Sequence, residues 1–233
     1  MAIEVPRLGV IASSPTIDHR IVPADQHADV DHIVGLLSLL ARFELQFRAA
    51  LALFDASDLE MWRTAREVEV GKQTWATLNA VTDTTNAWQR MAARDGALTI
   101  YHFGNAIEGI RKSLPRCPAV NASVDHDILR DASKTFRKAF PNYEAIRHVT
   151  GHVSDFTATP DRRREHSHIG ELEVGNISFD DSPRQFTGNL YNRSYVVSYK
   201  GRAYHYEISL DNAHVLYLVK LRVFSSLMVK PSR

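Results

Sequence analysis

Hydrophobic residues recur at three- and four-residue steps between positions 33 and 54. The repeating positions are Ile33, Leu36, Leu37, Leu40, Phe43, Phe47, Leu51 and Phe54. Because an α-helix has about 3.6 residues per turn, this spacing gathers the apolar side chains on one face and predicts an amphipathic helix. Asp29 or Asp31 precedes the run and is suited to cap it.

A second long helix is predicted over about residues 59–94. Ser57 or Asp58 is suited to cap this helix, and Gly71 is its weakest internal point. Asp95-Gly96 is expected to end it, since glycine favours the position that follows a helix.

Three tryptophans lie along this second helix at equal intervals: Trp62, Trp75 and Trp88. The interval of 13 residues amounts to about 3.6 turns, so the rings drift around the axis and form no single stripe. We expect them to be buried packing anchors rather than a stacking platform.

Three shorter helices are predicted between Gly96 and Pro160. The first covers about residues 97–114 and stops at Leu114-Pro115. The second is capped by Ser123 or Asp125, and its apolar face consists of Ile128, Leu129, Ala132, Phe136 and Phe140. The third runs from Asn142 to about Phe156, because Pro141 breaks the preceding helix.

The pattern changes after Pro160. Residues 161–168 (DRRREHSH) are predicted to form a charged loop. Alternating residues then predict strands over 185–190, 194–199 and 202–209, with Lys200-Gly201 as a hairpin turn. Asp211 is expected to cap a last helix, and a strand over residues 215–224 is the alternative.

These elements predict a mainly α protein: an antiparallel helical bundle with a small antiparallel β-hairpin or sheet inserted before the C-terminal helix. The expected domains are an irregular N-terminal arm (1–27), the bundle (28–158), and a segment with the charged loop, hairpin and last helix packing on the bundle (159–233). A separate C-terminal β domain is the alternative, although two or three strands rarely stand alone.

Composition bears on the cellular location and partners of the protein more than on its chemistry. The net charge of +1 gives no whole-molecule attraction to nucleic acid or membranes, so any basic surface must be local. The single cysteine, Cys117, excludes an internal disulfide framework. No signal peptide or membrane span is recognisable, so we expect a cytoplasmic protein that does not contact a membrane.

The segment from Glu144 to Asp155 concentrates the reactive side chains of the chain. It holds Arg147, His148 and His152 within about two helical turns. Two imidazoles that exchange protons beside a fixed cation are suited to cleave a phosphodiester or to bind a metal.

Arg147 and His152 resemble the R-x(4–6)-H signature of the HEPN superfamily, with His148 as the polar residue after the arginine. The same spacing occurs at three other arginine–histidine pairs, but only Arg147/His152 lies inside a predicted helix. The resemblance in architecture covers about residues 29–156 and the final helix. Ser154 stands where some family members carry a tyrosine, which weakens a link to a toxin–antitoxin pair.

This resemblance implies a metal-independent endoribonuclease that needs no cofactor, in a stress response or phage defence. His152 would act as acid or base, Arg147 would clamp the phosphate and His148 would assist. The resemblance also implies RNA as the partner and a homodimer in which two motifs face each other. A catalytically inert HEPN-like module that binds RNA or a regulatory protein is the alternative.

A metal-binding helical protein is a further alternative. Glu144, His148 and His152 are spaced by four and would share one face of a continuous helix, a standard arrangement for a metal clamp. Asp155 could join them, and His166 and His168 could do so if the charged loop folds back. In a purely structural interpretation, Glu144 and His148 simply form an ion pair on a solvated face.

Two further groups are secondary candidates. Asp95 and His102 lie near the start of the helix predicted over residues 97–114. Asp95 would supply a charge at its N-terminus, and His102 could face Arg147. Arg162, Arg163 and Arg164 could contact RNA phosphates, although such a run is more often a solvated surface.

Overall fold

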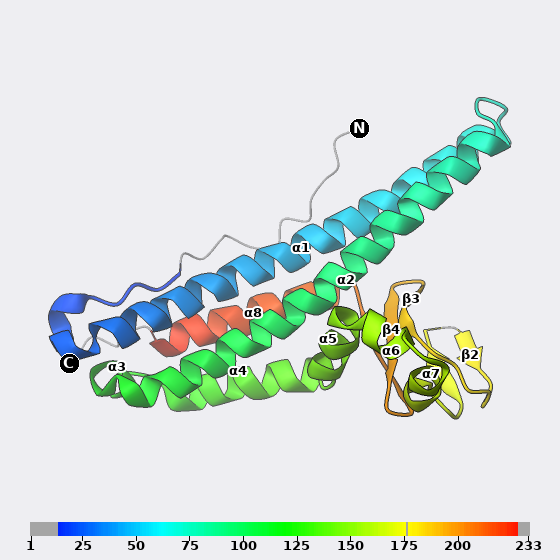
Figure 1. The fold of residues 1–233 in the computed structure, drawn as a ribbon. Coiled ribbons are helices and arrows are strands. Elements are labelled where there is room, and N and C mark those ends of the chain that lie inside the picture. The colour runs from blue at the N-terminus through cyan, green and yellow to red at the C-terminus, as the bar shows by residue number, and fades with distance from the viewer. Residues whose placement is uncertain (1–13, 176, 228–233) are drawn as a thin grey trace. The chain divides into compact units, whose positions relative to one another are not determined.

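The computed structural model describes residues 14–175 and 177–227, which fall into two compact units. Unit 1 contains Phe47–Leu98 and Asn142–Leu210, and unit 2 contains residues 14–46, Thr99–Pro141 and residues 211–227. Two long antiparallel helices, α1 (His27–Glu69) and α2 (Trp75–Ser113), contribute to both units (Figure 1). The predicted fold class is confirmed: the chain is mainly helical, with small antiparallel sheets before the C-terminal helix α8 (Leu210–Leu227).

The expected N-terminal arm lies partly outside the described residues, which begin at position 14. Two short 3₁₀ helices, η1 (His19–Ile21) and η2 (Ala24–Gln26), occupy its described part, and α1 follows directly. The division of the chain into residues 1–27, 28–158 and 159–233 stays a prediction.

Helices α1 and α2 are longer than the sequence pattern predicts. The breaks expected at residues 57–58 and 95–96 are wrong, and the chain reverses at residues 70–74, where Gly71 has a φ of +74°. The Ser57 hydroxyl donates to the Leu53 carbonyl at 2.6 Å, one turn back in the same helix. Its hydrogen bond is therefore satisfied without capping a new helix.

Gly96 lies inside α2, where the absence of a side chain leaves room for a tyrosine that packs against the helix. A Cβ atom at this position would lie 2.5 Å from Tyr206 Oη. The Tyr206 hydroxyl donates to the carbonyl of Ala93, in the same stretch of α2. Glycine serves close packing here, a role that the local sequence does not distinguish from the end of a helix.

The prediction that the three tryptophans are buried is wrong. Exposed fractions are 66% for Trp62, 72% for Trp75 and 42% for Trp88. Two paired helices bury only the stripe between them, so residues that drift around a helix axis point away from the partner helix.

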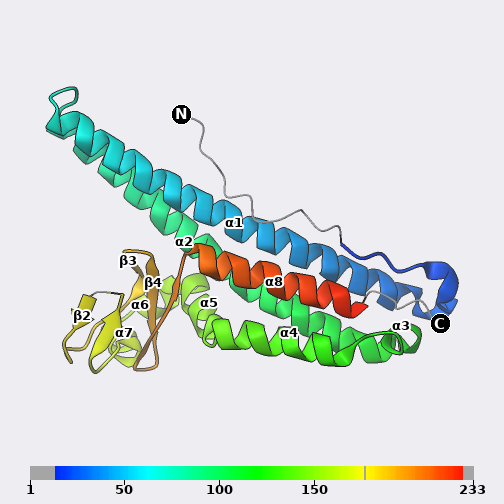
Figure 2. The same cartoon turned by 180° about the vertical axis from the view of Figure 1, so that it is seen from behind.

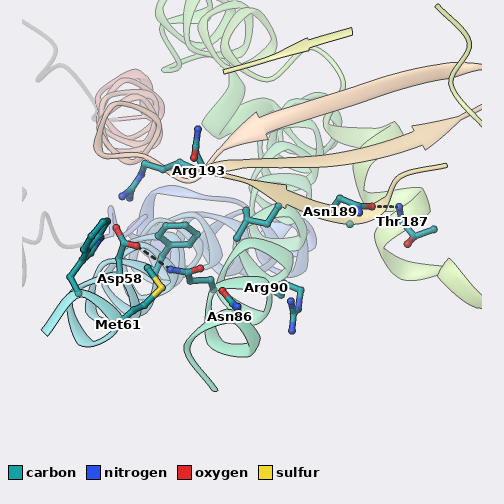
Figure 3. Close-up of a pocket in the computed structure, with 13 residues that line it drawn as sticks. Asp58, Met61, Asn86, Arg90, Thr187, Asn189 and Arg193 are labelled. Atoms are coloured by element: carbon teal, nitrogen blue, oxygen red, sulfur yellow. Dashed lines mark hydrogen bonds between the residues drawn. The ribbon is translucent and has the colours of Figure 1, made fainter. Parts of the chain in front are cut away.

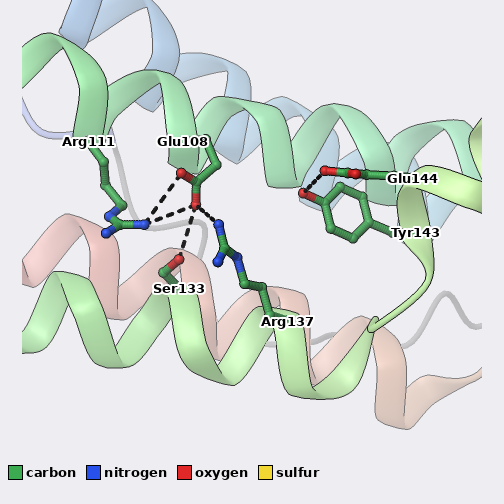
Figure 4. A network of polar contacts seen from close by, with 6 residues as sticks. All are labelled: Glu108, Arg111, Ser133, Arg137, Tyr143 and Glu144. Carbon is green, nitrogen blue, oxygen red and sulfur yellow. Dashed lines mark hydrogen bonds and ion pairs between the residues drawn. The ribbon is translucent and has the colours of Figure 1, made fainter.

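Unit 2 is built from helices. The parts of α1, α2 and α8 in this unit are joined by η3 (Leu114–Arg116), α3 (Pro118–Asn121) and α4 (His126–Ala139). Asp125 caps α4 as predicted, since its carboxylate accepts from the N–H groups of residues 127 and 128 at 3.2 and 3.1 Å. Glu108 of α2 accepts hydrogen bonds from Ser133 and Arg137 of α4 at 3.3 and 2.8 Å, which ties the two helices together (Figure 4).

Two sequence-based expectations concern the single cysteine and the absence of a membrane span. Cys117 is buried in unit 2 and makes no disulfide. None of the helices in the described ranges carries a stretch long and apolar enough to cross a membrane.

Unit 1 carries three short helices and two small sheets beside its share of α1 and α2. The helices are α5 (Tyr143–Gly151), α6 (Val153–Thr157) and α7 (Pro160–His166). The strands β3 (Thr187–Tyr191), β4 (Ser194–Tyr199) and β5 (Arg202–Glu207) form an antiparallel sheet in that order, and β1 (Leu172–Val174) pairs with β2 (Ile177–Phe179). Figure 2 shows these elements from the opposite side.

The predicted hairpin at Lys200-Gly201 is confirmed, whereas the β1–β2 pair was not predicted. Lys200 and Gly201 join β4 to β5 with positive φ values of 49° and 78°. The β1–β2 pair escapes prediction because three-residue strands are too short to show alternation.

The charged loop predicted at residues 161–168 is wrong over most of its length, because α7 occupies residues 160–166. The Thr159 hydroxyl caps this helix by accepting from the Arg162 N–H at 3.2 Å, and Pro160 follows it. Arg164 pairs with Asp161 one turn away at 2.7 Å. The Thr-Pro-Asp start signal outweighs the polar composition that suggested a loop.

A buried ion pair lies inside unit 2. Lys220 Nζ of α8 lies 2.8 Å from Glu44 Oε2 of α1, and each side chain exposes only 2% of its surface. Such a pair adds little net stability over apolar residues, but loss of one partner strands a buried charge.

We expect Lys220→Met to lower the free energy of unfolding by about 3–5 kcal/mol, because the Glu44 carboxylate would remain buried without its cation. The double substitution Lys220→Met/Glu44→Leu should recover most of that loss. Urea denaturation measures both. Arg222→Met is the matched control, since its pair with Asp131 is exposed and its loss should cost only about 0–1 kcal/mol. A double variant as unstable as the single variant would contradict this account.

Candidate functional site

The helix predicted over residues 142–156 is broken at His152. α5 ends at Gly151, His152 has φ −132° and ψ 33°, and α6 begins at Val153. The Thr150 hydroxyl donates back to the Ile146 carbonyl at 2.7 Å, an interaction that bends helices, and glycine follows it. The prediction that His152 lies within a helix is therefore wrong.

The structure nevertheless brings His148 and His152 together, and we call these residues the histidine pair. Their ring centroids are 5.4 Å apart. His148 is half-buried, whereas His152 is exposed and its Nδ1 lies 3.3 Å from Asp155 Oδ2. Because Nδ1 faces a carboxylate, the proton belongs on this nitrogen and Nε2 is left to exchange protons.

The His148 ring is part of a cluster of aromatic side chains. The His148 ring packs edge to face on Phe156 and Tyr199, with centroid distances of 5.3 and 5.1 Å. His166, at the end of α7, stacks on Tyr199 at 5.2 Å. The cluster joins α5, α6, α7 and β4, so it fixes the His148 ring in one orientation.

His166 and His168 have structural roles in this region. His166 is buried, and its Nδ1 accepts from the backbone N–H of Lys200 at 3.3 Å. His168 Nδ1 likewise accepts from the backbone N–H of Ala203 at 3.1 Å. Among the described residues, no group of three or more His, Cys, Asp or Glu side chains is arranged to hold a metal ion.

Burial and surrounding cations lower the pKa of His148 below its ordinary value of 6.5. Loss of hydration is the largest cause, and the positive charges of His152 and Arg147 add to it, followed by His166 and Lys200. Each of these effects disfavours the protonated ring. His148 is therefore held neutral near pH 7, the form that a general base requires.

Arg147 and Glu144 flank the histidine pair on α5. Arg147 is half-buried, and its charge acts on the neighbouring His148. Glu144 is exposed and accepts a hydrogen bond from the hydroxyl of Tyr143 at 3.1 Å (Figure 4), not from His148 as the structural interpretation expected. The candidate site thus consists of Arg147 and the histidine pair with Asp155.

The three arginines of α7 are exposed and engaged in local interactions. Arg164 pairs with Asp161 at 2.7 Å, and Arg162 approaches Glu165 at 4.0 Å. Arg163 Nε donates to the Thr157 carbonyl at 3.3 Å. This run is partly neutralised, so it forms a weaker basic patch than its sequence suggests.

The structure places Asp95 in unit 1 and His102 in unit 2. Asp95 lies within α2, so the predicted helix N-terminus beside it does not exist, and burial raises the pKa of its carboxyl. His102 belongs to unit 2, where it stacks on Phe43 with a centroid distance of 5.5 Å.

Sequence reasoning missed two adjoining cavities of unit 1. The first, which we call the arginine pocket, has a volume of about 340 Å³ and is lined by Arg90, Arg94, Thr150, Gly151, Val153, Ser154, Thr187, Gly188 and Tyr195. The second, the amide cleft, has about 930 Å³ and lies between the α1–α2 pair and β3 with the following turn (Figure 3). Arg90, Thr187 and Gly188 line both. The only sequence signal was the four-residue spacing of Arg90 and Arg94.

Comparisons with known proteins add no relationship: no family model, no curated protein and no solved structure matches this chain.

The lowered pKa of His148 predicts a pH dependence of stability. The unfolded chain binds more protons than the folded chain below about pH 6.5, so this contribution is present above that pH and is lost as the pH falls towards the lowered folded pKa. Wild type should therefore lose more stability than His148→Gln between about pH 7.5 and about pH 5.5 in urea denaturation.

An NMR titration supplies the control for this prediction. The His148 ring should titrate below pH 6.5, and His152→Gln should raise its midpoint by removing one nearby charge. A His148 midpoint at or above 6.5 in wild type would show that the ring is not held neutral.

Proposed function

We propose that this chain is a HEPN-like, metal-independent endoribonuclease whose acid–base groups are His148 and His152. The observation that supports the proposal is the contrast within the histidine pair. One ring is half-buried with a lowered pKa, and the neighbouring ring is exposed and oriented by Asp155. A neutral imidazole beside a second imidazole that a carboxylate orients is suited to act as base with the second ring as acid in one reaction.

The proposed reaction uses the 2′-hydroxyl of RNA as the nucleophile. Neutral His148 takes the proton of that hydroxyl while the 2′-oxygen forms a bond to phosphorus. Protonated His152 gives its Nε2 proton to the 5′-oxygen as the bond from phosphorus to that oxygen breaks. The products are a 2′,3′-cyclic phosphate and a 5′-hydroxyl, and Arg147 holds the nonbridging oxygens. No metal ion or other cofactor takes part.

The family resemblance extends the proposal to assembly and setting. Two copies would form a homodimer in which the Arg147 and His152 groups face each other and RNA passes between them. Arg162, Arg163 and Arg164 would contribute phosphate contacts once RNA displaces their local partners. A role in a cytoplasmic stress response or phage defence follows from the same resemblance.

A second candidate is an inert module that binds RNA or a regulatory protein. The exposed tryptophans favour it, because Trp62 and Trp75 line an apolar groove of about 880 Å³ with Leu59 and Leu78. Exposed aromatic residues of this kind are typical of binding surfaces.

The endoribonuclease proposal predicts RNA cleavage by the purified chain in the presence of excess chelator. His152→Ala and His148→Ala should each lower the cleavage rate by about 100-fold or more, the range of one acid–base group. Arg147→Ala should lower the rate by a similar factor because it removes charge stabilisation. The rate is measured on single-stranded RNA by gel separation of 2′,3′-cyclic phosphate products.

His205→Ala is the matched control, since His205 is an exposed histidine of the same unit on β5. It should cleave at the wild-type rate. Equal cleavage by wild type and His152→Ala would refute the nuclease proposal, and RNA binding without cleavage in wild type would favour the inert module.

A further inference from the structure

The arginine pocket has a strongly cationic lining. Arg90 and Arg94 are four residues apart in α2 and so share one face of the helix. Both side chains are exposed, and within the described ranges neither makes a hydrogen bond or ion pair. No lining residue is acidic. Two guanidinium groups left without carboxylates in one pocket are suited to bind an anion.

Hydroxyl groups and a glycine complete the pocket wall. Tyr195 is buried, with its hydroxyl 3.3 Å from Thr150 Oγ1 and close enough to Arg94 to sense its charge. A Cβ atom on Gly188 would lie 2.6 Å from the same hydroxyl, so only glycine leaves room at this wall. Thr187 and Ser154 add two more hydroxyls. The donors for a phosphate group in this cavity of about 340 Å³ are the guanidinium groups and the hydroxyls of Thr187 and Ser154. The Thr150 hydroxyl already donates to the Ile146 carbonyl, and the Tyr195 hydroxyl donates to Thr150 Oγ1.

The amide cleft continues from the arginine pocket across Arg90, and its chemistry is different. Its polar lining is rich in carboxamides, namely Asn86, Gln89, Asn189 and Asn192, and Figure 3 shows Asn86 and Arg90 on one helix opposite Asn189. Asn189 uses its Oδ1 to accept from the N–H of Thr187 at 3.1 Å. Its amide N–H₂ group remains a donor for a ligand.

The α1 wall of the amide cleft carries three large apolar or aromatic side chains around the Asp58 carboxylate, which accepts a hydrogen bond from the Gln89 amide at 3.3 Å. Trp62 lines it and is 66% exposed, beside Met61 and Phe54. A planar aromatic ring beside carboxamides is what a nucleobase needs, because stacking holds its face while amide donors and acceptors read its edge.

We propose that the arginine pocket and the amide cleft together bind a nucleotide, with the phosphate between Arg90 and Arg94 and the base in the amide cleft. The combined site has the order of size of a small-molecule pocket. The ligand is either a free nucleoside monophosphate or one nucleotide of a single-stranded RNA, since both present the same phosphate and base. Residues on both sides of His152 line the arginine pocket, but neither histidine of the pair does, and the site does not depend on the cleavage chemistry proposed for that pair.

Calorimetric titration of the full chain tests the proposal with each of the four ribonucleoside 5′-monophosphates, the matching nucleosides, inorganic phosphate and a short single-stranded RNA. At least one monophosphate or the RNA should bind. The matching nucleoside, which lacks the phosphate, should bind at least about tenfold more weakly. Arg90→Ala and Arg94→Ala should each weaken binding by about tenfold or more, the effect of one charge-assisted hydrogen bond. Binding should also weaken as salt rises.

Two controls separate this site from the rest of the chain. Arg42→Ala removes an exposed arginine of α1 that lines neither cavity and should bind like wild type. His152→Ala should bind nucleotide normally even if it abolishes RNA cleavage, so the two proposals fail independently. Binding of a monophosphate assigns the free ligand, and binding of RNA alone that is lost in Arg90→Ala assigns the strand. Absence of binding by every probe, or binding unchanged in both arginine variants, would overturn the proposal.

Discussion

The packing of Tyr206 against α2 is the contact on which the arrangement of unit 1 depends. Its ring is buried, its hydroxyl donates to the Ala93 carbonyl, and its approach requires that residue 96 has no side chain. Burial raises the pKa of this hydroxyl well above its ordinary value, so it keeps its proton and remains a donor. One residue of β5 thereby holds the three-stranded sheet against a helix, and both candidate sites lie where that sheet meets its neighbours.

Strand β4 contributes a tyrosine to each of the two candidate sites. Tyr195 and Tyr199 are four residues apart, so they share one face of the strand, and α5 packs on β4. The Tyr195 hydroxyl contacts Thr150 at the arginine pocket, and the Tyr199 ring packs on His148. A single strand face therefore supports both the histidine pair and the arginine pocket, which lie around the same short helix.

The arginines show why charge in a sequence does not translate directly into a basic surface. Residues 162–164 form the densest cationic run, yet α7 places Asp161 and Glu165 within reach of two of them. Arg90 and Arg94 attract no notice in the sequence, but α2 brings them together, and neither has a carboxylate partner among the described residues. Helical spacing decides which charges neutralise each other, because residues three or four apart are neighbours.

The sequence by itself determined the local elements: the Asp125 cap, the Lys200-Gly201 turn, the strands around it and the helical nature of residues 210–227. It also identified the Arg147–His152 segment as a concentration of reactive groups, because residue type and spacing are local properties. Only the tertiary structure decided that α2 continues through Gly96, that His152 lies at a helix break and that Trp62 is exposed. It alone formed the arginine pocket and the amide cleft. These features depend on contacts between residues far apart in the chain, such as Tyr206 with α2, and no periodicity within one segment encodes which segment will approach it.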